Sequence, residues 1–379
     1  MLTLSFSSYS LPLSRPVTTS RRAVVARGGW RVALRHSSGL VGVGEAACWP
    51  GFGGGEELAA RALEELAGGA HPALRALEAL PLREPLAPLP LADIEAACSW
   101  VGSPEARHAL ELAALDLRAR ALDLPLAALL AGQPLAPLAL SAPTHALVHD
   151  RGDAARALGE GYAALKMKVG VSPHWSQEAM EVARVAALLD QGGARVGLRL
   201  DANGAWGPTE ARAFCVVAGG LGAEWVEEPL RAPPLGDAGA WWREWRAVGA
   251  AGAAPLAADE SAPSPLAAEE AVRLGGARVV TLKPMFVGGL LPALRAAERV
   301  VALGARVCVT HALESSVGRR GAAHLCAALA ARGLSPAGGL GGGLDGDPSR
   351  PLPVLAGRVA LEPSPGLGDV RRPSAAGEA

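Results

Sequence analysis

The sequence VGLRLDAN, residues 196–203, is an apolar run that ends in two polar side chains, Asp201 and Asn203. The same form recurs along the chain. Apolar runs span 139–148, 164–169, 196–202, 225–229, 256–261, 279–284 and 307–315, and helical segments span, for example, 177–189, 209–217, 266–274, 290–303 and 318–331. Strands that alternate with helices predict parallel βα units. Seven or eight units in about 200 residues favour a (β/α) barrel.

An open doubly wound sheet is the rival architecture. Such a sheet usually carries a Gly-rich phosphate-binding turn after its first strand, and none is present there. Gly42-Val43-Gly44 is not a dinucleotide-binding turn, because no helix follows it at the required position. The glycine-rich residues 338–343 are expected to form a loop before the last strand.

The N-terminal third has a different pattern. Residues 1–50 indicate β-structure with turns, including a strand over 23–35 and another that leads to Glu45. Residues 56–82 and 92–121 are predicted to be helical, with a proline-rich break at 81–90. We therefore expect an α+β capping domain over 1–125, joined by the tail at about 346–379. The barrel domain is expected over 135–345.

Composition limits the possible partners and location. Apolar residues make up 50% of the chain, charged residues 19%, and the net charge is −1, so no overall field favours nucleic acid or a membrane surface. Five scattered cysteines, without a C-x-x-C, favour a reducing cytoplasm and disfavour a structural zinc site. A small-molecule ligand is the expected partner, and the composition favours neither a monomer nor a homo-oligomer.

The chain has 36 lysines and arginines together. Only three of them, Lys166, Lys168 and Lys283, are lysines, and the other 33 are arginines. Arginine essentially never gives up its proton, whereas the pKa of lysine falls with burial or nearby cations. The alternative explanation is a GC-rich codon bias that favours arginine and leaves three lysines by chance. The placement favours acid/base chemistry, because all three lysines end apolar runs near carboxylates.

Carboxylates end three successive runs, at Asp201, Glu227 and Asp259. If the runs are neighbouring barrel strands, these side chains meet at the C-terminal mouth, where such barrels place their chemistry. Three carboxylates without converging histidines or cysteines predict a site for Mg²⁺, with Mn²⁺ as a substitute and zinc disfavoured. Pairing of each acid with an arginine is the structural alternative.

Lys166 and Lys168 alternate on one strand and therefore share a face. Two ammonium groups beside a divalent cation disfavour each other's charged form, which would lower the pKa of one lysine toward neutrality. Lys283 is expected across the barrel. The predicted chemistry is removal of a proton beside a carboxylate, with the resulting enediolate stabilised by the metal and a lysine cation.

At this point the chain resembles the enolase superfamily, in its muconate-lactonizing subgroup. The resemblance covers nearly the whole sequence and rests on several segments: Gly42–Ala47, Leu165–Gly170, Leu200–Asn203, Val226–Pro229, Asp259–Ser261 and Leu282–Pro284. It implies a (β/α)7β TIM-like barrel with an α+β capping domain of enolase type. Within the superfamily, residues 11–16, 198–206, 283–289 and 314–318 are similar to o-succinylbenzoate synthases of menaquinone synthesis.

That resemblance implies a hydro-lyase: a Mg²⁺-dependent syn-dehydration of 2-succinyl-6-hydroxy-2,4-cyclohexadiene-1-carboxylate to 2-succinylbenzoate. Asp201, Glu227 and Asp259 would bind Mg²⁺. Lys168 would take the proton and return it to the departing hydroxyl, Lys166 would help set its pKa, and Lys283 would stabilise the enediolate. The implied substrate contacts are Arg199, Asn203, Thr310, Ser315 and Ser316.

Two other functions remain open. A racemase of N-acylamino acids or an epimerase of dipeptides would use the same lysines and metal, and would differ in the cap loops at about 15–22 and 49–55. A non-catalytic relative that binds a carboxylate is disfavoured by the presence of all three lysines and all three acids. His311 is interpreted as a spectator or a substrate contact, because Lys283 occupies the strand that would carry its acidic partner.

Overall fold

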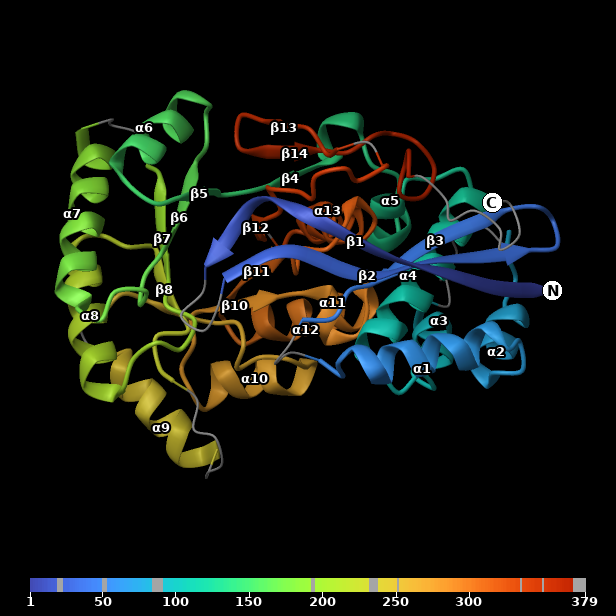
Figure 1. Cartoon of the computed structure of the whole chain (residues 1–379), viewed down its shortest axis with the longest axis horizontal. Coiled ribbons are helices and arrows are strands. Elements are labelled where there is room, and N and C mark those ends of the chain that lie inside the picture. The colour runs from blue at the N-terminus through green and yellow to red at the C-terminus, as the bar shows by residue number, and fades with distance from the viewer. Residues whose placement is uncertain are drawn as a thin grey trace.

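The computed structural model describes residues 1–18, 23–49, 53–83, 91–191, 195–231, 238–250, 252–334, 336–349 and 351–370. The remaining parts of the predicted cap loops, of the proline-rich break and of the tail lie outside the described residues. Figure 1 shows the strands and helices of a cap on one side of a barrel. None of the described helices is long and apolar enough to span a membrane.

The cap is built from an antiparallel sheet in the order β1-β2-β3, covered by helices. Its strands are β1 (Leu2–Thr18), β2 (Ala23–His36) and β3 (Val41–Ala46), and its helices are α1 (Glu56–Ala67), α2 (Pro72–Glu78), α3 (Leu91–Cys98), α4 (Pro104–Ala121) and α5 (Leu126–Ala131). A Cβ on Gly42 or Gly44 would lie within about 2 Å of an α4 carbonyl oxygen. These glycines therefore let α4 pack directly on β3.

Each of the two helical stretches predicted in the cap is two helices. The first is interrupted after α1, where Gly69 has a φ of 77° and Pro72 begins α2. The second is interrupted before α4, where the Ser103 hydroxyl accepts a hydrogen bond from Ala106 N and Pro104 occupies the first turn. The helical pattern of the sequence continued across both interruptions. It therefore did not reveal that new helices begin at Pro72 and Pro104.

The barrel strands follow one another in space in the same order as in the sequence, from β5 to β12. They are β5 (Ala146–Val148), β6 (Ala164–Lys168), β7 (Gly197–Asp201), β8 (Trp225–Glu227), β9 (Leu256–Ala258), β10 (Val279–Leu282), β11 (Arg306–Thr310) and β12 (Ala337–Gly339). All of their pairings are parallel. This order confirms the barrel prediction, because a doubly wound sheet would reverse its strand order.

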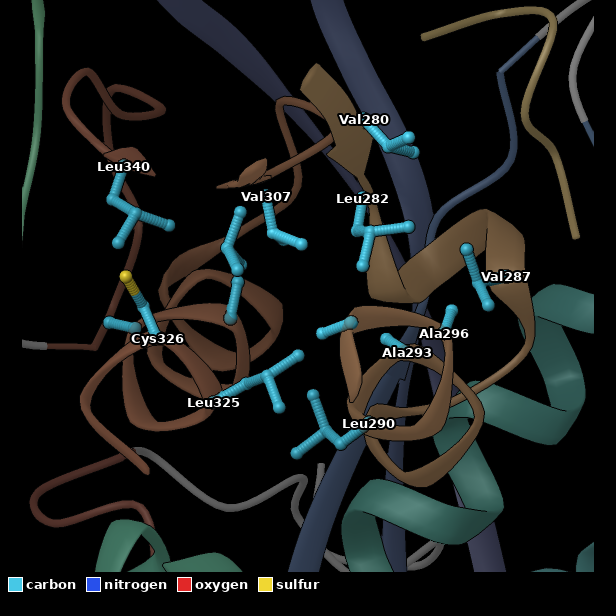
Figure 2. Packing of buried hydrophobic residues seen from close by; sticks show 14 of the residues in the cluster. Val280, Leu282, Val287, Leu290, Ala293, Ala296, Val307, Leu325, Cys326 and Leu340 are labelled. Atoms are coloured by element: carbon cyan, nitrogen blue, oxygen red, sulfur yellow. The ribbon is translucent and has the colours of Figure 1, made fainter. Parts of the chain in front are cut away.

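Helices connect the strands and surround them. They are α6 (Arg151–Gly159), α7 (Trp175–Gln191), α8 (Pro208–Gly220), α9 (Ala238–Val248), α10 (Pro265–Arg273), α11 (Pro284–Val287), α12 (Leu290–Ala302) and α13 (Ser316–Ala331). Figure 2 shows how α12 and α13 cover the strands. Its labelled residues are Val280, Leu282, Val287, Leu290, Ala293, Ala296, Val307, Leu325, Cys326 and Leu340, all of them in one buried cluster. This packing holds β10 and β11 against α12 and α13.

The prediction of a loop over residues 338–343 was wrong at its start, because Gly338 and Gly339 belong to β12. A Cβ on Gly338 would lie 1.9 Å from Pro143 O, and one on Gly339 would lie 2.5 Å from the His145 ring. His145 N donates to Gly338 O at 3.1 Å across the gap between β12 and β5. Glycine is required here because the barrel closes on itself, although glycine usually argues against a strand.

The C-terminal part of the chain contacts both the cap and the start of the barrel. After a short 3-10 helix at Pro137–Ala139, β4 (Ser141–Pro143) joins β13 (Val354–Leu355) and β14 (Arg358–Ala360) in a small antiparallel sheet. Farther on, Leu367 N donates to the buried carboxylate of Asp116 on α4 at 2.7 Å. The tail therefore contacts the cap as well as the start of the barrel. The predicted domain boundaries themselves stay a prediction.

Candidate active site

Three carboxylates gather at the C-terminal ends of adjacent barrel strands. Asp201 ends β7 and is paired in register with Glu227, which ends β8. Asp259 follows β9 directly. All three side chains are buried. The parallel register brings together residues that lie 26 to 58 positions apart in the sequence, as the spacing of the apolar runs predicted.

The three lysines lie among these carboxylates. Lys166 Nζ is 2.8 Å from Glu227 Oε1 and 3.0 Å from Asp201 Oδ2. Lys168 Nζ is 3.3 Å from Asp201 Oδ2, and Lys283 bonds to both oxygens of Asp259. Lys166 and Lys168 belong to β6, while Lys283 follows β10 on the far side of the cluster. The carboxylates are therefore paired with lysines, and not with arginines as in the structural alternative.

Burial and pairing act against each other on these groups. Burial raises the pKa of Glu227 to about 7, despite the attraction of Lys166, and burial also raises the pKa of Asp259. Burial alone would lower the pKa of Lys166, but the charges of Asp201 and Glu227 outweigh it, so that this pKa lies above its usual value. The lowered lysine pKa expected from the Lys-x-Lys pattern presupposes a cation beside the pair and stays a prediction.

Asn203 lies at the rim of this cluster. Its main-chain N–H donates to Asp201 Oδ1 at 3.1 Å, and its side-chain Nδ2 donates to Glu260 Oε1 at 2.7 Å. It is therefore next to the candidate metal ligands, where a substrate contact was predicted. Thr310 ends β11 at the same mouth, and its buried hydroxyl has no hydrogen-bond partner among the described residues. Both substrate contacts stay predictions.

Arg199 lies deeper in the barrel, two residues before Asp201 on the same strand. Its guanidinium donates to Glu224 Oε2 at 2.8 Å and to Gly338 O at 3.3 Å, and it lies 3.1 Å from His145 Nδ1. It also stacks 4.3 Å from the centroid of the Trp225 ring. These partners connect β7 to the seam of the barrel, so the predicted substrate contact would compete with several protein contacts.

Ser315 and Ser316 begin α13 and bond to residues from elsewhere in the chain. Ser315 N and its hydroxyl donate to the two oxygens of Glu45 at 2.8 and 2.6 Å. Ser316 N donates to Asp347 Oδ2 at 2.7 Å. The N-terminus of α13 therefore already faces protein carboxylates. The predicted substrate-binding role of both serines would compete with these bonds.

His311 is held between two main-chain groups. Its Nε2 lies 2.7 Å from Gly341 O, so this nitrogen carries the proton, and its Nδ1 accepts from Leu313 N at 3.0 Å. Burial lowers the pKa of the imidazole to about 3. A neutral ring with both nitrogens bonded to the backbone fits the spectator interpretation.

The junction between cap and barrel was not predicted from the sequence. Glu45, on β3 of the cap, accepts hydrogen bonds from Tyr9 Oη, from Ser315 and from Gly318 N, the last at 2.8 Å. Arg27 of β2 donates to the carbonyls of both Ala47 and Ala312. Glu45 is 270 positions from Ser315. Two signals in the sequence were its position as the first acidic residue of the chain and its place within Gly42–Ala47, one of the segments that resemble the superfamily.

Two protein-family models match the chain. The enolase C-terminal domain-like model matches residues 150–373, and the N-terminal domain model of mandelate racemase and muconate lactonizing enzyme matches residues 3–131. The chain belongs to this family of the enolase superfamily. Its relatives place it in the muconate-lactonizing subgroup, whose enzymes are isomerases or lyases, and thereby confirm that part of the prediction from sequence.

Relatives within the enolase superfamily carry several activities. L-Ala-D/L-Glu epimerase from Bacillus subtilis (strain 168) is 29% identical over 335 residues, which cover 86% of this chain and 85% of the relative. o-Succinylbenzoate synthase from Thermobifida fusca (strain YX) is 37% identical over 165 residues, which cover 43% of this chain and 47% of the relative. The similarity to the synthase is therefore partial, whereas the similarity to the epimerase extends over most of both chains.

Solved structures agree on the fold. A substrate-liganded complex of the Bacillus subtilis epimerase has a TM-score of 0.77 at 24% identity and covers 97% of this chain and 98% of that one. The dipeptide epimerase from Enterococcus faecalis V583, complexed with Mg and the dipeptide L-Leu-L-Tyr, has a TM-score of 0.74 at 22% identity, covering 97% and 98%. Both confirm the capped barrel of the enolase superfamily.

The donor set of this enolase-superfamily chain suits a magnesium ion. In the described part of the chain, no three His, Cys, Asp or Glu side chains are grouped so that they could hold a metal ion as they are placed. Asp201, Glu227 and Asp259 each bond to a lysine in this arrangement. Burial raises the pKa of Glu227 although the ammonium of Lys166 is bonded to it. These three carboxylates are the residues that could hold Mg²⁺ when it replaces the lysines as their counter-ion.

Proposed function

We propose that this protein is an epimerase or racemase that moves a proton on and off the carbon beside a carboxylate. The proposed substrates are dipeptides or N-acylated amino acids. The proposal is supported by the epimerase relative that is similar over 86% of the chain. The racemase or epimerase, which was the alternative in the sequence analysis, therefore becomes the main interpretation. The dehydratase becomes the second one.

The observation that carries the proposal is the position of two lysines on opposite walls of the barrel. Lys168 ends β6 and Lys283 follows β10, four strands farther along an eight-stranded sheet. The carboxylate cluster lies between them. Inversion of a stereocentre requires a base on one face of the substrate and an acid on the other. Removal of water from one face requires only one of these lysines.

Mg²⁺ held by Asp201, Glu227 and Asp259 would supply Lewis-acid polarisation of the substrate carboxylate. Lys168, once neutral, accepts the proton from one face of the α-carbon, and the ammonium of Lys283 returns a proton to the other face. In the reverse direction the two lysines exchange these roles. Lys166 lies beside Lys168 on the same strand, and its ammonium bonds to Asp201 and Glu227.

Proton exchange in D₂O tests this assignment directly. The protein is incubated with Mg²⁺ and either L-Ala-L-Glu or an N-succinylamino acid, and NMR follows the loss of the α-proton while chiral chromatography follows inversion. We expect exchange and inversion together in the wild type. Lys168→Ala and Lys283→Ala should each exchange at most one of the two stereoisomers and invert neither. Inversion at the wild-type rate by either variant would contradict the two-lysine mechanism.

Dehydration of 2-succinyl-6-hydroxy-2,4-cyclohexadiene-1-carboxylate is the second candidate. It is favoured by the 37% identity to an o-succinylbenzoate synthase over 165 residues. The assay follows loss of the diene absorbance with Mg²⁺, with and without a chelator. Rapid, chelator-sensitive loss without inversion of any dipeptide or N-acylamino acid would favour the synthase over the epimerase.

A further inference from the structure

Three non-glycine residues that follow barrel strands adopt a left-handed backbone conformation, and two of them, Asn203 and Glu228, lie beside the carboxylate cluster. Asn203 has a φ of 45° and Glu228 a φ of 42°. Asparagine adopts this conformation fairly readily, whereas a glutamate rarely does. Glu228 directly follows Glu227, one of the candidate metal ligands. A strained conformation at such a position is kept only where surrounding contacts enforce it.

The contacts of Glu228 connect three strand ends. Its Oε1 accepts hydrogen bonds from Asp259 N at 2.7 Å and from both the main chain and the hydroxyl of Ser261. Its main-chain N–H donates to Ala257 O at 3.0 Å, and its carbonyl accepts from Gly204 N at 2.6 Å. Glu228 thus links the end of β8 to the residues that follow β7 and β9.

The left-handed turn determines where the carboxylate goes. In a regular strand, side chains 227 and 228 would point to opposite faces, and residue 228 would face the surrounding helices. Here the carboxylate of Glu228 instead meets the main chain of Asp259, while Glu227 stays inside the barrel beside Lys166. Two consecutive glutamates therefore both serve the cluster, one directly and one through its neighbour.

A second bond secures the same loop from the other side. Asn203, which follows Asp201 after one residue, donates from Nδ2 to Glu260 Oε1 at 2.7 Å. Asp259 thus has a main-chain bond to Glu228 on one side, and its neighbour Glu260 has a side-chain bond to Asn203. Both left-handed residues act on the short segment that carries the third carboxylate.

We propose that Glu228 is a positioning residue that fixes the main chain of Asp259 and thereby sets the affinity of the site for a divalent cation. The inference rests on the proposed function in one respect, the assignment of Asp201, Glu227 and Asp259 to Mg²⁺. It adds a residue outside the three candidate ligands, one that bonds to the main chain of Asp259. Outer residues that orient metal ligands typically change metal affinity by about 10- to 100-fold when they are replaced.

The test measures the Kd for Mg²⁺ by titration calorimetry and the Tm by circular dichroism, without substrate. Glu228→Gln keeps an oxygen that can accept from Asp259 N, and Glu228→Met keeps the size but offers no acceptor. Both variants carry a neutral side chain, so they differ from each other in the hydrogen-bond acceptor and not in charge. The matched control is Glu224→Gln, which lies just before β8 at the opposite end of the barrel and bonds to Arg199 and Arg306.

We expect the Kd to rise about tenfold or more in Glu228→Met and about threefold in Glu228→Gln. Glu224→Gln should lower the Tm and leave the Kd unchanged. Equal affinities of the Met and Gln variants, or a wild-type Kd in the Met variant, would overturn the inference. If Glu228→Met does not fold, Ser261→Ala decides instead, with a Kd raised about twofold expected and an unchanged Kd contradicting us. Absence of Mg²⁺ binding by the wild type would overturn the proposed function instead.

Discussion

Two buried glutamates of this chain have opposite surroundings. Glu45, at the junction of cap and barrel, accepts hydrogen bonds from two main-chain N–H groups, a serine hydroxyl and a tyrosine hydroxyl. Glu227, at the barrel mouth, is bonded to the ammonium of Lys166. Both side chains are almost completely buried. The first is held by groups that the fold fixes in place, and the second by a long side chain that can move.

The difference shows how a protein separates a structural carboxylate from a reactive one. Main-chain donors at the start of α13 cannot leave Glu45 without unfolding the helix end. A lysine can leave Glu227 by rotation about its side-chain bonds and make room for a divalent cation. Burial raises the pKa of Glu227 even though this lysine is bonded to it.

The largest effect is expected when a lysine of the candidate active site is replaced. For the stereoisomer whose α-proton faces Lys168, Lys168→Ala should lower the rate of exchange by about 10³-fold, because the base is lost, and should leave the Tm nearly unchanged. Lys168→Arg is the matched control, since it keeps the charge beside Asp201 but cannot lose a proton. Exchange by the arginine variant at more than a tenth of the wild-type rate would show that Lys168 is not the base.

Glu45→Ala tests the carboxylate that is held by fixed donors at the junction of cap and barrel. Four donors would lose their acceptor at the junction, and we expect the free energy of unfolding in urea to fall by about 3 kcal/mol. Glu57→Ala, on the surface of α1, should have no measurable effect, because its bond to Arg61 is exposed. A loss at Glu45 no larger than that at Glu57 would mean that the junction contributes nothing to stability.

Magnesium should distinguish the two glutamates in one experiment. Mg²⁺ at about 100 times its Kd should stabilise the wild type by about 2.7 kcal/mol, because it binds only the folded state. Glu227→Ala should abolish this stabilisation, and Glu45→Gln should retain it despite a lower starting stability. Thermal unfolding with and without Mg²⁺ at constant ionic strength measures both. Equal stabilisation of all three proteins would place the cation elsewhere.

Glu111 of α4 is a third buried glutamate, and its effect on stability is expected to depend on pH. Its Oε1 accepts from Leu291 N at 2.9 Å, and its Oε2 has no partner in the described part of the chain. Burial raises its pKa from 4.5 to about 8. Between these two pH values the folded state holds a proton that the unfolded state releases, so stability should fall with rising pH by at most about 1.4 kcal/mol per unit.

The comparison protein for this prediction is Glu111→Gln, which has no proton to lose. Its free energy of unfolding should fall less steeply than that of the wild type between pH 5 and pH 8, and the two curves should run parallel above pH 8. Urea unfolding at several pH values measures the difference. Parallel curves throughout the range would show that Glu111 is ionised in the folded protein.

The sequence predicted the barrel strands and the mouth of the site because both depend on local patterns. An apolar run that ends in Asp201 or Lys283 has the same meaning wherever it occurs. The role of Glu45 could not be predicted in this way, because its partners Ser315 and Gly318 lie 270 and 273 positions away in the sequence. The strand at Gly338 was missed for the same reason. Its glycines are explained by Pro143 and His145, which come close only after the barrel has closed.

All three lysines of the chain lie in one site, and this has a practical consequence. Reagents that attack primary amines can reach only the N-terminal amine and these three side chains. Reductive methylation with ¹³C-formaldehyde would therefore introduce a few resolved NMR signals, and every signal from a side chain would report on the carboxylate cluster. Titration with Mg²⁺ would then show lysine by lysine which ammonium groups give way to the cation, without labelling any other side chain.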